Sequence, residues 1–387
     1  MNWIKKHGGD IVLTITSTII TLVLIDVALY FSPLKATIYR LNYPQYYFVD
    51  DVELGYDIAK NFPTSTHFFK DAAFPIWSNN LGCFDTDFSG ETPYIYLGGD
   101  SLTWSFTPFE DTWGRRIEKL LGTRTIKCGV VGYGTKQELM KAKKIIGSFA
   151  SPSLIIVGYT AYNDFSDDVN SPQNTSYNGY LVKDLAKNGV TEEQAQEKYA
   201  NFTKYCSPVI PSNRTVARIR CFVTNRSVLF NLFKSDIRAK IDLLFPQLTQ
   251  ALEKQGVLAQ QEGTPIEKTD AEYEKHLNNI LDFKKFAEEK DARLLFVLAP
   301  YDNTRVIPFL EKENIPYVDL DPVFGTYSKA TPLIWPKDGH YNIAGNHVVG
   351  LVVSKFIIEN NLVKIADAQE QLQEIDKQLS NEFGNQE

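Results

Sequence analysis

The sequence predicts a three-layer α/β/α protein in which a parallel β-sheet is covered by helices on both faces. Two observations lead to this fold class. Short runs of aromatic, β-branched and other apolar residues alternate with segments whose apolar residues recur at helical spacing, which is the rhythm of βαβ units. In addition, a chain of 387 residues that is 43% hydrophobic can bury one large core together with an extension.

The expected strands are almost wholly apolar, as strands of a sheet buried on both faces should be. They are residues 94–97, 125–131, 154–159, 293–298 and 316–320. The expected helices are residues 111–121, 136–146, 273–290 and 342–358. Residues 32–92 are rich in aromatic residues and turn formers, and we expect a lead-in that packs on the α/β domain, with short strands.

The alternation of strands and helices breaks between residues 165 and 270. This stretch is polar and too long for a plain loop, so it is expected to be an inserted helical cap with helices at residues 191–203 and 234–255. Residues 361–387 carry apolar residues at spacings of three and four, which predicts an amphipathic helix. That helix either docks on its own domain or pairs with another chain.

One segment is long and apolar enough to cross a membrane. Residues 11–31 number 21, of which 15 are apolar and only Asp26 is charged, and about 20 such residues span a bilayer. No small-x-small cleavage pattern follows, which favours an uncleaved signal anchor over a removed signal peptide; the alternative is a buried core helix. Residues 1–10 are expected to be cytoplasmic, with the rest of the chain outside, although the basic residues flanking the span give no clear bias.

Ser101 is a candidate nucleophile. It follows the expected strand 94–97 and two glycines, Gly98 and Gly99, which let the backbone turn sharply. The residue therefore lies at the carboxyl end of a strand, where open α/β sheets bind ligands. A serine hydroxyl attacks an ester when a neighbouring imidazole takes its proton and a carboxylate orients that imidazole, so partners for Ser101 must exist elsewhere in the chain.

Residues 99–102, Gly-Asp-Ser-Leu, resemble the first block of the SGNH/GDSL hydrolases, and three later segments resemble that family's other blocks in order. These are residues 126–134, 153–164 and 335–340. The resemblance covers residues 93–164 and 271–360, and it implies a flavodoxin-like SGNH hydrolase fold. One block alone says little, whereas four in order, each at a strand end or a helix entry, are specific.

The resemblance implies a catalytic group and an oxyanion hole. Ser101 is the expected nucleophile, His340 its base and Asp338 the acid that orients His340. The expected oxyanion donors are the backbone N–H groups of Ser101 and Gly132 and the side-chain amide of Asn163, with Gly129 and Gly134 as weaker alternatives to Gly132.

Two positions depart from the family pattern. The third block usually has glycine where this chain has Ala161, and the acid usually lies three residues before the histidine, at the position of Lys337. Asp338 is only two residues before His340, an arrangement similar to that of exported-polysaccharide O-acetyltransferases. Without the other blocks, Asn163 and the residue after it could simply end a strand in an Asx-turn.

Charge and residue spacing exclude several classes of protein. The formal net charge of −7 and the pI near 5.4 argue against general nucleic-acid binding. No cluster of His, Cys, Asp and Glu has metal-ligand spacing and no glycine-rich phosphate loop occurs, so neither a metal nor a cofactor is expected. The remaining histidines, His67, His276 and His347, are expected to be structural or solvated.

The cysteines and the glycosylation sequons are relevant to the cellular compartment in which the chain resides. Cys206 and Cys221 are close enough in sequence to form a local disulfide in an oxidising compartment, Cys128 is expected to be a buried small hydrophobe, and Cys83 either pairs or stays free. In a eukaryotic secretory chain the sequons could carry glycans, and in a bacterium they mean nothing. They begin at Asn174, Asn201, Asn213 and Asn225.

These features predict a single-pass, membrane-anchored serine esterase of SGNH type with its catalytic domain outside the cytoplasm. It would remove or transfer an acyl group, acetyl above all, on a glycan or another small ester through an acyl-enzyme. Two alternatives stay open: a noncatalytic, membrane-tethered glycan-binding or assembly protein with this fold, and a lipase or thioesterase. Aromatic residues where the insertion begins could stack on sugar rings; they are Tyr162, Phe165, Tyr177 and Tyr180.

Overall fold

The computed structural model describes residues 2–32, 41–70, 72–169, 174–177, 179–183, 219, 223, 226–230, 269–335 and 338–383. The chain divides into two compact units, one of residues 1–42, 68–73 and 191–266 and the other of residues 43–67, 74–190 and 267–387. Several expectations lie outside the described residues: the cap helices at 191–203 and 234–255, the Cys206–Cys221 pair, and the sequons at Asn201, Asn213 and Asn225.

The first unit contains helix α1 (Asn2–Tyr30). Its part Gly9–Tyr30 has a mean hydropathy of 2.3, and its apolar side chains are exposed rather than buried. Among the described residues, this is the helix whose length and composition suit a membrane span, and a signal sequence would pass the same test. Asp26, the charge within it, accepts a hydrogen bond from the Leu229 backbone N–H at 2.8 Å.

The second unit is built on a five-stranded parallel sheet with the order β12-β11-β8-β6-β7. Counted along the chain from the β7 edge, the order is 2-1-3-4-5, which is the flavodoxin-like doubly wound order. The winding reverses between the neighbouring strands β6 and β8, so the switch point lies at their carboxyl ends. The strands are β6 (Tyr94–Gly99), β7 (Arg124–Lys127), β8 (Leu154–Tyr159), β11 (Arg293–Leu298) and β12 (Tyr317–Asp319).

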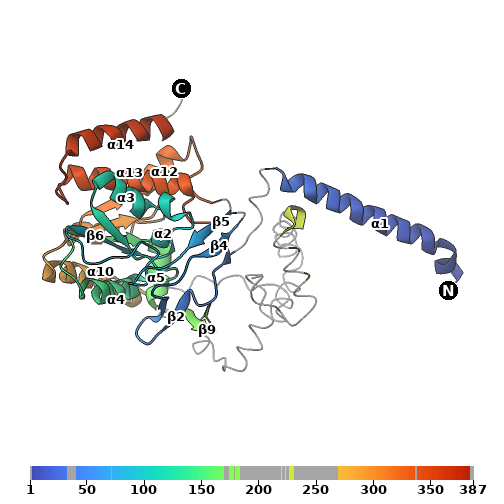
Figure 1. The fold of residues 1–387 in the computed structure, drawn as a ribbon, viewed down its shortest axis with the longest axis horizontal. Coiled ribbons are helices and arrows are strands. Elements are labelled where there is room, and N and C mark those ends of the chain that lie inside the picture. The colour runs from blue at the N-terminus through green and yellow to red at the C-terminus, as the bar shows by residue number, and fades with distance from the viewer. Residues whose placement is uncertain are drawn as a thin grey trace. The chain divides into compact units, whose positions relative to one another are not determined.

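Helices cover both faces of this sheet, which confirms the predicted three-layer α/β/α fold (Figure 1). One layer contains α3 (Trp113–Leu121), α12 (Asp321–Tyr327), α13 (Ile343–Glu359) and α14 (Ala368–Phe383). The other contains α4 (Thr135–Ile146), α5 (Ala161–Val169), α10 (Asp270–Glu289) and α11 (Ile307–Lys312). A short helix, α2 (Ser101–Trp104), follows β6, and a 3-10 turn, η2 (Phe109–Asp111), precedes α3.

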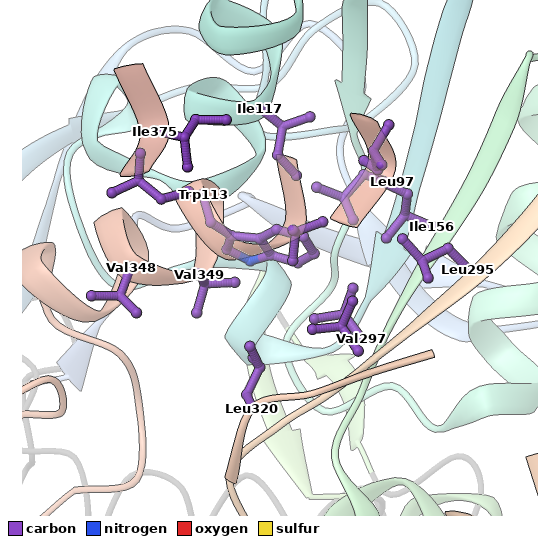
Figure 2. Close-up of a cluster of buried hydrophobic side chains, with 14 of the residues drawn as sticks. Leu97, Trp113, Ile117, Ile156, Leu295, Val297, Leu320, Val348, Val349 and Ile375 are labelled. Carbon is purple, nitrogen blue, oxygen red and sulfur yellow. The ribbon is translucent and has the colours of Figure 1, made fainter. Parts of the chain in front are cut away.

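The strands and the helices of the first layer are apolar because their side chains form a buried core between them. Every residue of β6 and β8 is buried, as expected for central strands of a covered parallel sheet. Fully burying one aliphatic or aromatic side chain contributes about 1.5–3 kcal/mol. Figure 2 shows strand residues such as Leu97, Ile156 and Leu295 grouped with Trp113 of α3 and Val349 of α13.

The C-terminal helix α14 docks on its own domain. Its residues Ile375, Leu379 and Phe383 are buried in the same core cluster as α13. The apolar face of this helix is therefore buried against its own domain, which is the first of the two expected arrangements. Its polar side faces solvent, with Glu370 and Glu374 among the exposed residues.

The lead-in and the start of the insertion form small antiparallel sheets. The lead-in strands are β1 (Leu41–Asn42), β2 (Phe48–Asp51), β3 (Gly55–Ile58), β4 (Ser65–Phe69) and β5 (Ala72–Ile76). After α5 the insertion continues as a hairpin, β9 (Asn174–Tyr177) and β10 (Tyr180–Lys183), so its described beginning is not wholly helical. This hairpin binds the lead-in: the Ser176 backbone N–H donates to Asp50 Oδ1 at 3.1 Å.

The cysteine expectations need a correction. Cys128 is not an unpaired hydrophobe; it forms a disulfide with Cys83, 45 residues away. Both residues are buried, at 0% and 2% exposure. The bond joins the end of the lead-in to the residue after β7, and β7 pairs with β6. It therefore fastens the lead-in to the edge of the main sheet.

Lys127, the last residue of β7, is fully buried beneath α2. Its ammonium donates to the Trp104 carbonyl at 2.9 Å and lies 4.5 Å from the centre of the Phe84 ring. Burial lowers the pKa of Lys127 to about 7, against the opposing effect of Asp85. Lys127 thus holds the end of α2 through this hydrogen bond. Its neutral amine can donate the bond as well as its ammonium can.

Replacing Cys83 and Cys128 together by alanine should lower the free energy of unfolding by about 4 kcal/mol, because closing a loop of this length restricts the unfolded chain. Urea unfolding of the full chain under oxidising conditions measures the change. Wild type unfolded in the presence of a reductant should show a similar loss. Equal midpoints for the variant and oxidised wild type would show that the bond does not stabilise the fold.

Lys127 should make stability depend on pH. Between pH 7 and about 10.4, the ordinary lysine pKa, the unfolded chain holds a proton on Lys127 that the folded chain has lost. The free energy of unfolding then rises with pH by up to about 1.4 kcal/mol per unit. Relative to Lys127→Met, wild type should gain stability from pH 7 to pH 9 in urea titrations, whereas parallel curves would contradict the lowered pKa.

Candidate active site

Ser101 is the first residue of α2 and follows directly on β6, at the switch point of the sheet. Gly99 adopts a φ of +146°, and a Cβ there would lie 2.1 Å from Thr103 Oγ1 and 2.9 Å from the Gly158 carbonyl oxygen. Only glycine fits this turn. Asp100 caps α2, because its Oδ1 accepts from the Leu102 backbone N–H at 2.8 Å.

His340 lies on the loop between α12 and α13, and its Nε2 is 2.8 Å from Ser101 Oγ. Residues 239 positions apart in the sequence therefore meet at one edge of the sheet. The Phe106 ring packs edge-on against the imidazole, with ring centres 4.3 Å apart. The His340 side chain is 26% exposed, so the imidazole is reachable from solvent, while Ser101 is 7% exposed.

Asp338 binds His340 twice through one oxygen. Asp338 Oδ1 lies 2.5 Å from His340 Nδ1 and also accepts from the His340 backbone N–H at 2.9 Å. An acceptor at Nδ1 requires the proton on that nitrogen, which leaves the Nε2 lone pair facing the Ser101 hydroxyl. The two-residue spacing that departs from the family pattern thus brings the carboxylate to the imidazole through a closed turn.

The expected oxyanion donors are the backbone N–H groups of Ser101 and Gly132 and the Asn163 amide. Gly132 has a φ of +77°, and a Cβ there would meet Asn174 Nδ2 at 2.7 Å and the Tyr56 hydroxyl at 3.0 Å. No described residue accepts a hydrogen bond from the Ser101 or Gly132 backbone N–H. Asn163, in the first turn of α5, donates one side-chain N–H to Asp100 Oδ2 at 2.9 Å. Its amide is therefore oriented next to Ser101 and has a second N–H to offer.

Gly129 and Gly134, the weaker alternatives to Gly132, are closely packed as Gly132 is. A Cβ on Gly129 would lie 2.5 Å from the Trp104 backbone nitrogen, and one on Gly134 would lie 2.6 Å from Asp168 Oδ1. Gly134 also caps α4. The Asx-turn alternative for Asn163 is likewise not what forms, because α5 begins at Ala161 and continues to Val169.

Buried carboxyl groups lie beneath the site. Burial raises the pKa of Asp100, partly offset by hydrogen bonds from the Leu102 backbone and the Asn163 amide. Burial, together with neighbouring carboxylates, holds the pKa values of Asp164 and Glu138 well above their ordinary range. The raised pKa values favour the neutral form of both carboxyl groups. Among the described residues, no group of three or more His, Cys, Asp or Glu side chains is arranged to hold a metal ion.

His276 belongs to a buried hydrogen-bonded chain that supports α5. The Tyr159 hydroxyl is 2.8 Å from His276 Nε2, and His276 Nδ1 is 2.7 Å from Asp168 Oδ2. Asp168 also accepts from the Asn279 amide at 2.6 Å and from the Lys136 backbone N–H at 2.8 Å. These contacts join α5 to β8, α10 and α4. His276 is thus structural rather than solvated.

Sequence reasoning gave no role to three residues that contact the site. Asp100 binds Asn163, Phe106 packs on His340, and the Tyr301 hydroxyl donates to the Gly339 carbonyl between Asp338 and His340. The sequence contained a signal that could have identified Asp100 and Tyr301. Asp100 lies inside the first block, and Tyr301 lies three residues beyond a strand's carboxyl end, where parallel sheets place their sites. Phe106 had no comparable signal, since aromatic residues are common in this chain.

No family model and no curated sequence matches the chain. A solved member of the lipolytic G-D-S-L family from Veillonella parvula is 9% identical, with 67% of this chain and 94% of that one covered and a TM-score of 0.34. A protein described as lipolytic and of the G-D-S-L family, from Desulfitobacterium hafniense, is 10% identical over 68% and 99% of the two chains, with a TM-score of 0.35.

A third solved structure is a carbohydrate esterase family 2 enzyme with a carbohydrate binding domain, from Corynascus thermopiles. It is 12% identical over 76% of this chain and 72% of that one, with a TM-score of 0.27. At these identities and scores the likenesses carry no argument about this chain, and the activities named are those of the other proteins. In its own residues, the chain has the doubly wound fold and four segments that resemble the sequence blocks of the SGNH/GDSL hydrolases.

Proposed function

We propose that this chain is a serine esterase of SGNH type in which Ser101 is the nucleophile, His340 the base and Asp338 the orienting acid. One observation carries the proposal: hydrogen-bond distances of 2.8 Å and 2.5 Å connect Ser101 Oγ, the His340 ring and Asp338 Oδ1 in an unbroken line. This arrangement activates a hydroxyl that is otherwise a weak nucleophile.

The reaction follows from this geometry. Ser101 Oγ bonds to the ester carbonyl carbon while His340 Nε2 takes the hydroxyl proton, and Asp338 stabilises the imidazolium that forms. The tetrahedral intermediate collapses when its bond to the leaving alcohol breaks and His340 returns the proton to that oxygen. An acyl-Ser101 ester remains. Water or another hydroxyl, deprotonated by His340, then attacks this ester. The bond between Ser101 Oγ and the acyl carbon breaks, and His340 returns the proton to Ser101 Oγ.

The oxyanion that develops in each half of the reaction needs fixed donors. We assign the backbone N–H groups of Ser101 and Gly132 and the second N–H of Asn163 to this role. Among the described residues, none of these three hydrogens has another acceptor, and the Asn163 amide binds the Asp100 carboxylate next to Ser101. Loss of one such donor typically costs about 3–4 kcal/mol of transition-state stabilisation.

The acyl group that we propose is a small one such as acetyl. Leu102 and Tyr341, the residues after Ser101 and His340, are buried. A glycan as the acyl carrier is supported by the Asp338-Gly339-His340 spacing, similar to that of exported-polysaccharide O-acetyltransferases.

The proposed location is the outer side of a membrane, with residues 11–31 as an uncleaved anchor and residues 93–164 and 271–360 as the catalytic domain. Helix α1 has the length and composition of a span. The Cys83–Cys128 disulfide supports the orientation, because disulfides persist in oxidising compartments and are rare in the cytosol.

Replacing Ser101 by alanine should abolish hydrolysis of p-nitrophenyl acetate and remove labelling by a fluorophosphonate probe, since both need the activated hydroxyl. Replacing the exposed Ser148 by alanine is the matched control and should change neither. Circular dichroism and the melting temperature check that both variants fold. Unlabelled wild type would reject the enzyme and favour a noncatalytic glycan-binding or assembly protein, whereas labelling that persists in Ser101→Ala would point to another serine.

Replacing Asp338 by asparagine should lower kcat by about 10²–10⁴-fold, because the amide cannot stabilise the imidazolium or hold its tautomer in the same way. Asp321→Asn, at an exposed carboxylate at the start of α12, is the control and should retain wild-type kcat. Steady-state kinetics on an acetyl ester measure both. An Asp338→Asn enzyme with unchanged kcat would mean that His340 works without this acid.

A further inference from the structure

We propose that Tyr301 is a positioning residue for this reaction, which holds the turn of Asp338, Gly339 and His340 so that the imidazole stays aligned with Ser101. The inference rests on the proposed function, because it assigns His340 the role of base. Tyr301 acts through the Gly339 carbonyl, to which its hydroxyl donates a hydrogen bond. It is not among the residues that the sequence blocks single out.

The position of this hydrogen bond in the turn lets it affect both Asp338 and His340. Gly339 is the one residue between Asp338 and His340, so a rotation of its peptide moves both. The bonds from Asp338 Oδ1 to the two His340 nitrogens fix the pair to each other, but they do not fix the pair to the sheet that carries Ser101. That requires an anchor from outside the turn, and Tyr301 supplies one.

Tyr301 is itself held by the central part of the sheet. It lies three residues after β11, which pairs with β8 on one side and β12 on the other. The Tyr301 backbone N–H donates to the Ala299 carbonyl at 2.7 Å, and the Ala299 N–H donates to the Tyr159 carbonyl of β8 at 2.8 Å. The ring packs, partly buried, against the main core cluster. The hydroxyl therefore has a fixed position relative to β8 and, through β8, to β6 and Ser101.

The hydroxyl also keeps its proton. Burial, reinforced by the nearby carboxylates Asp100 and Asp338, raises the pKa of Tyr301 to about 12. Tyr301 is therefore a hydrogen-bond donor throughout the neutral and mildly alkaline range. The Gly339 carbonyl keeps its partner at each pH where His340 can act as a base.

The loss of this bond should harm the reaction far more than the fold. A single hydrogen bond makes a small net contribution to stability, and a core of this size tolerates its loss. A displacement of about 1 Å at a reacting group, in contrast, can lower the rate by about 10²-fold. Removal of the hydroxyl alone tests this difference, because phenylalanine keeps the ring and its packing.

The test compares Tyr301→Phe with Tyr317→Phe in the full-length chain in detergent. Tyr317, on β12, is a matched control because its hydroxyl binds the exposed Glu311 carboxylate at 3.0 Å, away from His340. Tyr301→Phe should lower kcat for p-nitrophenyl acetate and the rate of fluorophosphonate labelling by about 10–100-fold, with KM within twofold and an unchanged melting temperature. Tyr317→Phe should match wild type in all four.

Two kinetic results would overturn the proposal. If KM rises while kcat and the labelling rate stay constant, Tyr301 contacts the substrate instead of positioning the base. If nothing changes, the hydroxyl has no part in the reaction. A fall in melting temperature that accounts for the lost activity would likewise reduce Tyr301 to a structural role.

A measurement that needs no turnover separates this inference from the proposed function. In ¹⁵N-histidine-labelled protein, the His340 ring signals are identified by their loss in His340→Gln, and their ¹⁵N chemical shifts are compared between variants at one pH. Tyr301→Phe should change the His340 chemical shifts and Tyr317→Phe should not. If wild type neither turns over ester nor labels, but Tyr301→Phe changes these chemical shifts, the esterase fails and the positioning stands. Unchanged chemical shifts reject the positioning whatever the activity.

Discussion

One oxygen of Asp338 receives both the backbone N–H and the ring Nδ1 of His340, and the rest of the site depends on that double contact. The backbone bond closes the turn and brings the carboxylate within reach of the ring. The ring bond sets the tautomer, which leaves Nε2 to accept from Ser101. The turn itself places the carboxylate relative to the ring, and this is why a two-residue spacing suffices here.

The sequence predicted the meeting of distant segments because parallel strands end at the same edge of a sheet. Strands 154–159 and 293–298 have the predicted bounds, since each is a short apolar run between turn residues. Once the strands are placed, Ser101 after β6 and Asn163 after β8 must share the switch point. His340 could be added only through its family block, because no local pattern says which loop reaches that edge.

Contacts that depend on side-chain register could not be predicted. Cys128 pairs with Cys83 because β7 is an edge strand that the lead-in approaches, and neither fact appears in the spacing of the cysteines. His276 lies in a helix with many polar residues, yet Tyr159 and Asp168 enclose it after the chain folds. The predicted strand 125–131 ends four residues early, at Lys127, since the following residues turn past α2 towards Gly132.

The charge state of the buried carboxyl groups matters for the oxyanion. Burial and the nearby Asp100 carboxylate raise the pKa values of Glu138 and Asp164, and Asp100 accepts a hydrogen bond from the Asn163 amide. Three negative charges there would oppose a fourth on the reacting carbonyl oxygen, because Coulomb repulsion is weakly screened in a buried site. The raised pKa values of Asp164 and Glu138 favour their neutral forms and so reduce this repulsion. Asp100 accepts one N–H of Asn163, and in the proposed mechanism the other N–H serves the oxyanion.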